Sequence, residues 1–149
     1  MAPKQLSPQQ AMLLENQLCF ALYSTSLAMT KVYKPLLDEL GLTYPQYVVM
    51  LVLWEGDGLM VAEIGERLFL DSGTLTPLLK RLQSASLITR FRDPEDERCL
   101  SVNLTAAGRK LKSRAAMISS CILSATQYSS PELISITQEI IALRKRLKT

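Results

Sequence analysis

The chain has 149 residues, of which 48% are hydrophobic, and a formal net charge of +3 at pH 7, which predicts one compact domain with a sizeable core. It has no histidine, the commonest general base and metal ligand, and three widely spaced cysteines form no metal-site or disulfide pattern. We therefore expect neither an enzyme nor a cofactor or metal site. No apolar run reaches the ~18 residues that span a membrane, and the N-terminus lacks a signal-peptide core, so we expect a cytoplasmic protein with no membrane partner.

The N-terminal half is predicted to be helical. The first helix starts with a capping box at Ser7–Gln10, although Asn16 is a second possible cap, and Pro35 is expected to stop or kink the helix. A second capping box at Thr43–Gln46 opens a very apolar helix that continues to Trp54 and should be buried.

Two short helices are predicted next, at residues 61–68 and from residue 73 to about 84. The turn between them ends in good capping residues, Asp71 and Ser72, which makes this segment a helix-turn-helix candidate. Pro77 removes a backbone hydrogen bond one turn into the second helix, so either the first turn is loose or Thr74 is the true cap.

The periodicity then changes from helix to strand. Residues 100–104 alternate strictly between apolar and polar, and residues 87–91 are the natural antiparallel partner. The charged segment 92–98 between them is too long for a tight hairpin. A helix-turn-helix followed by a hairpin with a charged tip is the order of a winged helix.

The C-terminal third is predicted to be helical. Thr105 caps a helix that runs to about Tyr128, and Ser130 restarts a final helix. The final helix carries an apolar seam with three- and four-residue spacing: Leu133, Ile136, Ile140, Leu143 and Leu147. The seam could pack on its own chain, but its distance in sequence from the predicted core favours an intertwined homodimer.

The predicted fold is therefore mainly α with a small β-hairpin. We expect a single domain over residues 1–149, with a winged helix-turn-helix at 45–104. The regions at about 7–40 and 106–149 would supply N- and C-terminal dimerisation helices.

Basic residues cluster beside the predicted helix-turn-helix. Residues 80–114 hold nine of the seventeen basic residues and only four acids. A solvated face explains such a cluster equally well, and its position favours binding of double-stranded DNA. The candidate DNA-contact residues on the second helix are Asp71, Ser72, Thr74, Thr76, Pro77, Lys80 and Arg81. Ser72 is equally explained as a plain cap.

Arg98 is the candidate wing residue, since a long fork-shaped donor can enter a narrow minor groove. Asp93 and Asp96 could hold it extended, although a surface salt bridge worth under ~1 kcal/mol is the simpler explanation. A dimer presenting two such helices should bind a pseudo-palindromic operator.

Three segments resemble the MarR family of bacterial regulators: Asp71–Leu82, Asp93–Arg98 and Leu104–Arg109. Three others are similar to OhrR-type sensors of organic hydroperoxides within that family: Gln17–Tyr23, Tyr33–Leu37 and Leu42–Tyr47. The resemblance implies a repressor of a hydroperoxide resistance gene. It also implies that Cys19 is the redox-sensing thiol, in a pocket with Tyr23, Tyr33 and Tyr44.

Helical spacing adds an independent constraint on this pocket. Cys19 and Tyr23 share a helix face, whereas Tyr33 lies fourteen residues away, or roughly 21 Å at ~1.5 Å per residue. If both belong to one site, Tyr33 must come from a partner subunit. The apolar neighbours Phe20 and Leu22 suit an alkyl hydroperoxide, although core packing explains them as well.

The resemblance to two-cysteine members implies that Cys121 resolves oxidised Cys19 in an intersubunit disulfide. An ordinary buried helix cysteine is the alternative, in which case a small thiol would cap Cys19. Cys99 is expected to face outward without a redox role.

Three other functions fit parts of the pattern. The first is a MarR-type repressor released by a small aromatic ligand, with Cys19 as a bystander. The others are a thiol peroxidase, which leaves the wing unexplained, and a constitutive DNA-binding protein that ignores oxidants.

Overall fold

The computed structural model describes residues 5–96 and 99–148 and has the predicted fold, mainly helical with a small antiparallel sheet. The helices are α1 (Pro8–Ala11), a 3-10 turn (Leu14–Asn16), α2 (Leu18–Asp38), α3 (Tyr44–Glu55), α4 (Val61–Leu68), α5 (Ser72–Ser84), α6 (Ala106–Ala115), α7 (Ile118–Thr126) and α8 (Ser130–Leu147). The strands are β1 (Leu59–Met60), β2 (Ile88–Arg92) and β3 (Leu100–Leu104).

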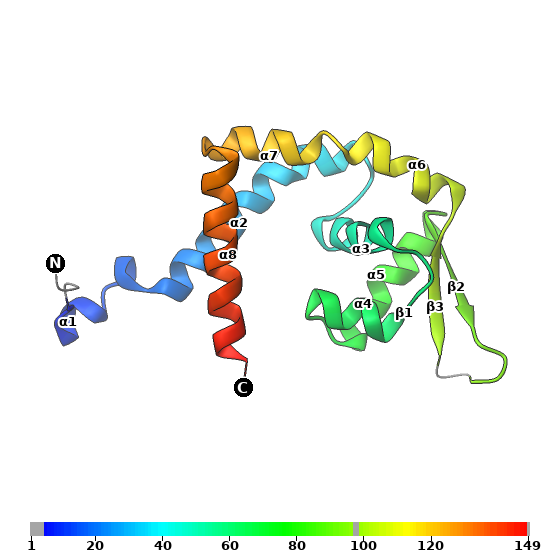
Figure 1. Ribbon diagram of the computed structural model, residues 1–149, viewed down its shortest axis with the longest axis horizontal. Coiled ribbons are helices and arrows are strands. Elements are labelled where there is room, and N and C mark those ends of the chain that lie inside the picture. Colours follow the sequence, from blue (N-terminus) through cyan, green and yellow to red (C-terminus); the bar gives the residue numbers. More distant parts are fainter. Residues whose placement is uncertain (1–4, 97–98, 149) are drawn as a thin grey trace.

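The molecule has two parts (Figure 1). The winged helix-turn-helix, from α3 to β3, gathers at one end. The first half of α2 extends away from it, and α8 runs downward between these two regions. Helices α6 and α7 run between the two parts, and α2 lies alongside α7. Among the described residues, no helix is both long and apolar enough to cross a membrane.

The N-terminal prediction is partly wrong. The capping box at Ser7 is confirmed, but α1 ends after one turn, and α2 begins only at Leu18. Asn16 is not a cap, because its side-chain amide donates to the carbonyl oxygen of Gln10 at 2.8 Å. Helix α2 also continues through Pro35, which is exposed, because Leu37 beyond it is buried in the core. The proline removes one backbone donor without ending the helix.

The predicted burial of α3 is confirmed, and its capping box at Thr43 is present. Val49, Met50 and Leu53 are almost fully buried, and together with Ile64 of α4 and Leu75 of α5 they belong to one hydrophobic core. Large apolar side chains that lose their contact with water here supply the main stabilising term of the domain.

Helix α5 begins one residue earlier than expected. Asp71 is its cap, accepting from the backbone N–H of Thr74 at 2.7 Å, so Thr74 is not the cap and the first turn is regular. Both explanations offered for Pro77 are therefore wrong. The proline lies inside α5 on its exposed side, and the buried leucines of the opposite face, Leu75, Leu78, Leu79 and Leu82, hold the helix in place.

The predicted hairpin is confirmed, with β2 one residue later than expected. Ile88 pairs with Leu104 and Arg92 with Leu100. The sheet has a third strand that the sequence did not indicate, because β1 contains only two residues. It pairs with the other side of β3, Leu59 opposite Val102, giving the order β1-β3-β2.

The single helix predicted after Thr105 is two helices, α6 and α7, separated at residues 116–117. Thr105 caps α6 as expected. No residue of α8 is buried, and within its apolar seam Ile140 and Leu147 are exposed. Leu133, Ile136 and Leu143 are half-buried, so the chain covers this seam only in part with its own body.

The base of the wing is joined to the helical body by short contacts. The indole N–H of Trp54 donates to the carbonyl oxygen of Gly108 at 2.9 Å. The Asp57 carboxylate accepts from the backbone N–H of Leu104 and from Arg109, both at 2.8 Å. A Cβ on Gly108 would overlap the carbonyl oxygen of Leu87, so only glycine fits here.

We predict that Gly108→Ala lowers the free energy of unfolding by about 1–3 kcal/mol, because the obstructing atom belongs to the backbone and cannot rotate away. Urea unfolding at fixed protein concentration, followed by Trp54 fluorescence, measures the change. Gly56→Ala is the matched control, since its Cβ meets nothing within 4 Å, and it should stay within about 0.5 kcal/mol of wild type. Equal losses in the two variants would contradict this packing.

Candidate nucleic-acid interface and thiol site

The surface of α5 brings together most of the predicted DNA-contact residues. Ser72, Thr74, Pro77, Lys80 and Arg81 are exposed, and Thr76 is half-buried, while the leucines face the core. The hydroxyl side chains sit in the first turns, where free backbone N–H groups give the helix end a partial positive charge.

Asp71 holds the start of this surface in place. Hydrogen bonds from the backbone and the side chain of Thr74, with another from the backbone of Gly73, lower the pKa of the Asp71 carboxyl. The ionised carboxylate therefore fixes the first turn of α5 at neutral pH. It is a structural cap, and a direct contact to DNA is not needed to explain it.

In the wing, Arg98 lies outside the described residues, so its predicted pairing with Asp93 and Asp96 stays a prediction. Cys99 precedes β3 and is only partly exposed. Its thiol lies 3.4 Å from the Asp96 carboxylate, and this hydrogen bond raises the pKa of Cys99. At the base of the wing, Arg90 donates to the side chain of Gln83 on α5 at 2.6 Å.

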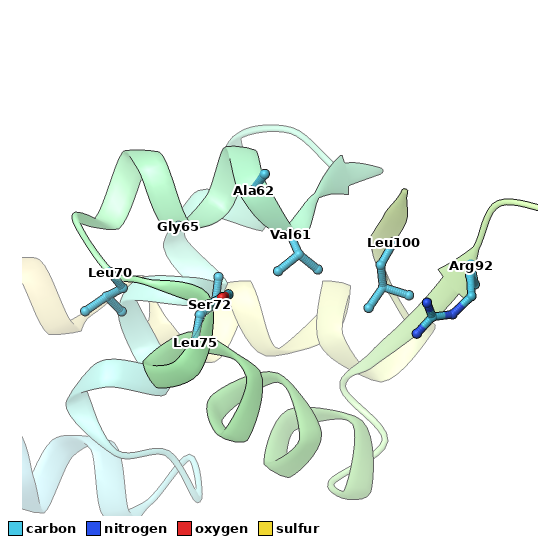
Figure 2. A pocket seen from close by; sticks show the side chains of 8 residues that line it. All are labelled: Val61, Ala62, Gly65, Leu70, Ser72, Leu75, Arg92 and Leu100. Carbon is cyan, nitrogen blue, oxygen red and sulfur yellow. The ribbon is translucent and has the colours of Figure 1, made fainter. Parts of the chain in front are cut away.

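A hollow of about 480 Å³ lies between α4, the start of α5 and the wing strands. Figure 2 shows the side chains that line it. Val61, Leu75 and Leu100 give it an apolar lining, with Ser72 on one side and the Arg92 guanidinium on the other. The sequence placed Arg92 in the basic cluster but not among the contact residues. Its position at this hollow depends on the fold of the wing over α4, which no local pattern indicates.

The candidate sensing thiol is on the surface of the chain. Cys19 is the second residue of α2, in a first turn with free backbone N–H groups, and it is exposed. Its neighbours Leu18, Phe20 and Tyr23 are also exposed, Tyr23 to 63%. Core packing within one chain therefore does not explain this apolar segment.

The tyrosines form a separate cluster. Tyr33 lies edge-on to Tyr44 with ring centroids 5.0 Å apart, and Tyr47 lies 6.0 Å from Tyr33. Tyr47 was not among the predicted pocket residues, and α3 brings it into the cluster. A hollow of about 240 Å³ beside Tyr33 and Tyr44 is closed on another side by Ile140 of α8.

The structure unites Tyr33 with Tyr44 but not with Cys19. Cys19 and Tyr33 lie on one uninterrupted helix, α2, so the ~21 Å separation estimated from helical rise applies within a chain. Cys121 is partly buried on α7, and all three cysteines are free.

Tyr33 generates a prediction in alkali. Burial, followed by the neighbouring phenols Tyr44 and Tyr47, raises the pKa of Tyr33 to about 12. The stabilisation that comes from neutral Tyr33 is therefore complete below pH 10 and is lost as the pH rises through about 12. We expect the urea concentration at the unfolding midpoint to fall less steeply with pH over this range in Tyr33→Phe than in wild type. Tyr23→Phe, which removes an exposed phenol, should leave the slope as in wild type, and equal slopes in all three proteins would contradict the prediction.

Known proteins match this chain over most of its length. The sequence model of a family described as transcriptional regulator SarA/Rot matches residues 31–115, more than half of the chain. The organic hydroperoxide resistance transcriptional regulator of Bacillus subtilis (strain 168) is 50% identical over 136 residues, covering 91% of this chain and 92% of that protein.

Solved structures agree with the sequence relatives. Reduced AbfR bound to DNA, a protein of Staphylococcus epidermidis, is 34% identical, with a TM-score of 0.79 over 96% of this chain and 100% of that one. Disulfide-formed AbfR is 37% identical, with a TM-score of 0.65 over 89% of this chain and 96% of that one. The relatives are transcriptional regulators rather than enzymes, as the sequence predicted. The chain belongs to the SarA/Rot family of transcriptional regulators, and within the MarR-type winged-helix proteins it groups with the regulators of organic hydroperoxide resistance.

Proposed function

We propose that this protein is a redox-sensing repressor that binds a pseudo-palindromic DNA operator as a homodimer and leaves it when an organic hydroperoxide oxidises Cys19. One observation carries the proposal: a chain with a winged helix-turn-helix exposes a cysteine in the first turn of α2, among exposed apolar side chains. A bacterial regulator of this kind would act in the cytoplasm, where the DNA is.

The DNA-binding half uses α5 as the recognition helix. Thr74 and Thr76 reach base edges in the major groove, while Ser72, Lys80 and Arg81 contact phosphates and set the register. Arg98, held by Asp96, enters the adjacent minor groove. The reduced AbfR structure, in which a relative of similar fold is bound to DNA, supports this arrangement.

The homodimer covers the apolar surfaces that one chain leaves open. The seam of α8 and the first half of α2 expose more apolar side chains than a monomer ordinarily presents, including Leu18, Leu27 and Ile140. Pairing two chains through these helices buries the exposed faces and brings Tyr33 and Tyr44 of one subunit to Cys19 of the other. This completes a thiol pocket that one chain cannot form.

The chemistry starts from the thiolate. The thiolate sulfur of Cys19 attacks one peroxide oxygen of ROOH. The O–O bond breaks, the alkoxide leaves and is protonated to the alcohol, and Cys19 becomes a sulfenic acid. The thiol of Cys121 from the other subunit then attacks this sulfur, so that an S–S bond forms and water leaves. Phe20 and its apolar neighbours favour an alkyl peroxide over hydrogen peroxide.

The disulfide would release DNA by moving the two recognition helices. Cys19 and Cys121 lie on α2 and α7, which run between the dimerisation region and the winged helix. Joining them across subunits shifts these helices and spoils the fixed half-site spacing. The existence of AbfR in reduced DNA-bound and disulfide forms supports such a cycle. Release by a small aromatic ligand is not favoured, because the Bacillus subtilis relative is a regulator of organic hydroperoxide resistance and AbfR has a disulfide form.

Lys80 tests the DNA-binding half. We expect Lys80→Ala to weaken binding to operator and unrelated DNA alike, and to reduce the slope of log K against log salt by about 1, as for one lost phosphate contact. Fluorescence anisotropy over a salt series measures both. Lys34→Ala is the control, since Lys34 pairs with Asp38 on α2, and its slope should match wild type. An unchanged slope in the Lys80 variant would remove this residue from the interface.

Cys19 tests the sensor. In a gel shift with the DNA upstream of the protein's own gene, we expect wild type to release the DNA after cumene hydroperoxide treatment. Cys19→Ser should remain bound, while Cys99→Ser should respond as wild type.

Non-reducing electrophoresis of the same samples separates the fates of Cys19. A covalent dimer should form in wild type and be absent in Cys121→Ser. Release of Cys19→Ser by the peroxide would refute the sensor, whereas a covalent dimer without Cys121 would refute only the resolving step.

A further inference from the structure

The turn of the helix-turn-helix contains a residue whose type is rare in the backbone conformation that it adopts. Phe69 ends α4 in the left-handed region, with φ 58° and ψ 36°. Glycine is the usual residue at such a helix end, and a bulky side chain there is strained. The ring is also 49% exposed, so burial in the core does not explain why phenylalanine stands here.

The Phe69 ring contacts the far end of the chain. The guanidinium carbon of Arg144 lies 4.3 Å from the ring centroid, and the ammonium nitrogen of Lys148 lies 3.9 Å from it. Both distances are well inside the range of a cation–π interaction. Arg144 lies in the last turn of α8 and Lys148 follows the end of that helix. The two cations repel each other, and their attraction to the ring of Phe69 offsets this repulsion.

The contact joins the two parts of the molecule. In Figure 1, α8 (orange to red) runs down from α7, and its last turn reaches the level of α4. No residue of α8 is fully buried within the chain, and this contact ties the end of α8 to the turn after α4.

On the other side of the contact, Phe69 is close to the recognition helix in sequence. The N–H of Leu70 bonds to the carbonyl oxygen of Gly65 at 3.0 Å, and Asp71 caps α5 immediately afterwards. A shift of Phe69 is therefore passed on within two residues to the start of α5.

We propose that Phe69 is a positioning residue: with Arg144 and Lys148 it forms a cation–π latch that ties the dimerisation helix α8 to the recognition helix and so fixes the distance between the two recognition helices of the homodimer. This inference rests on the proposed function. It adds a second connection between dimerisation region and DNA-binding region, independent of α6 and α7.

The test compares binding to the operator with binding to the same operator lengthened by one base pair between its half-sites. A dimer with fixed helix spacing should lose affinity sharply on the insertion. In Phe69→Leu, which keeps an apolar side chain but has no π face, we expect native-operator affinity to fall about 5-fold and the penalty for the insertion to shrink.

Two further sets of variants distinguish loss of the latch from a general loss of protein stability. Phe69→Gly removes the ring and suits the left-handed backbone, so its thermal midpoint should stay near wild type while spacing discrimination falls. Arg144→Gln with Lys148→Gln should behave in the same way. Lys145→Gln with Arg146→Gln removes the same charge from the same helical turn without touching the ring, and should keep wild-type discrimination.

Distances measured in the absence of DNA test the latch independently of operator binding. A spin label on Ser84→Cys, at the end of α5 in a chain whose natural cysteines are replaced by serine, reports the distance between the two winged domains. We expect one narrow distribution that broadens in Phe69→Leu and in the Arg144–Lys148 double variant.

The outcomes distinguish the two proposals. Wild type that binds no operator contradicts the proposed function, and the spin-label distances then decide the latch. The latch is overturned if wild type binds the operator and discriminates against the insertion, but the Phe69 variants and the Arg144–Lys148 double variant do the same. Their spin-label distances would then also equal those of wild type.

Discussion

The fold depends on the close approach of α6 to the base of the wing. Gly108 lies against the carbonyl oxygen of Leu87 with no room for a side chain, and the same glycine accepts a hydrogen bond from Trp54. Asp57 adds a carboxylate that holds the end of β3 and the start of α6. Because α6 leads into α7, a movement of α7 reaches the wing through this junction.

The tyrosine cluster extends the junction toward the proposed thiol pocket. Tyr33 and Tyr44 contact Tyr47, whose ring lies 6.4 Å from that of Trp54. A packed path thus runs from α2 through α3 to α6. Contiguous packing by itself does not transmit a signal, since transmission needs an element with two arrangements. In the proposed mechanism those elements are α2 and α7, which an intersubunit disulfide would displace together.

The sequence predicted the features that depend on residues close together along the chain. The caps at Ser7, Thr43 and Thr105 depend on side chains three residues from the groups they bind, and the contact face of α5 follows from its leucine spacing. β1 was missed because two residues carry no periodicity and their partner lies more than forty positions away. The α6–α7 break was missed because neither glycine nor proline marks it. The contact of Phe69 with Arg144 was missed because the two residues are far apart in sequence. The left-handed backbone of Phe69 was missed because phenylalanine seldom adopts that conformation.

The proposed sensor places opposite demands on one chain. Cys19 must be reached by a peroxide and must then move toward Cys121, whereas two recognition helices can match fixed half-sites only if their separation is constant. A rigid, fully packed dimerisation region would satisfy the second demand and resist the movement that oxidation must cause. The chain instead leaves α8 without buried residues of its own and fastens its end by exposed cation–π contacts, which are individually weak. Such contacts hold the spacing in the reduced dimer and break readily when a covalent bond pulls the helices elsewhere.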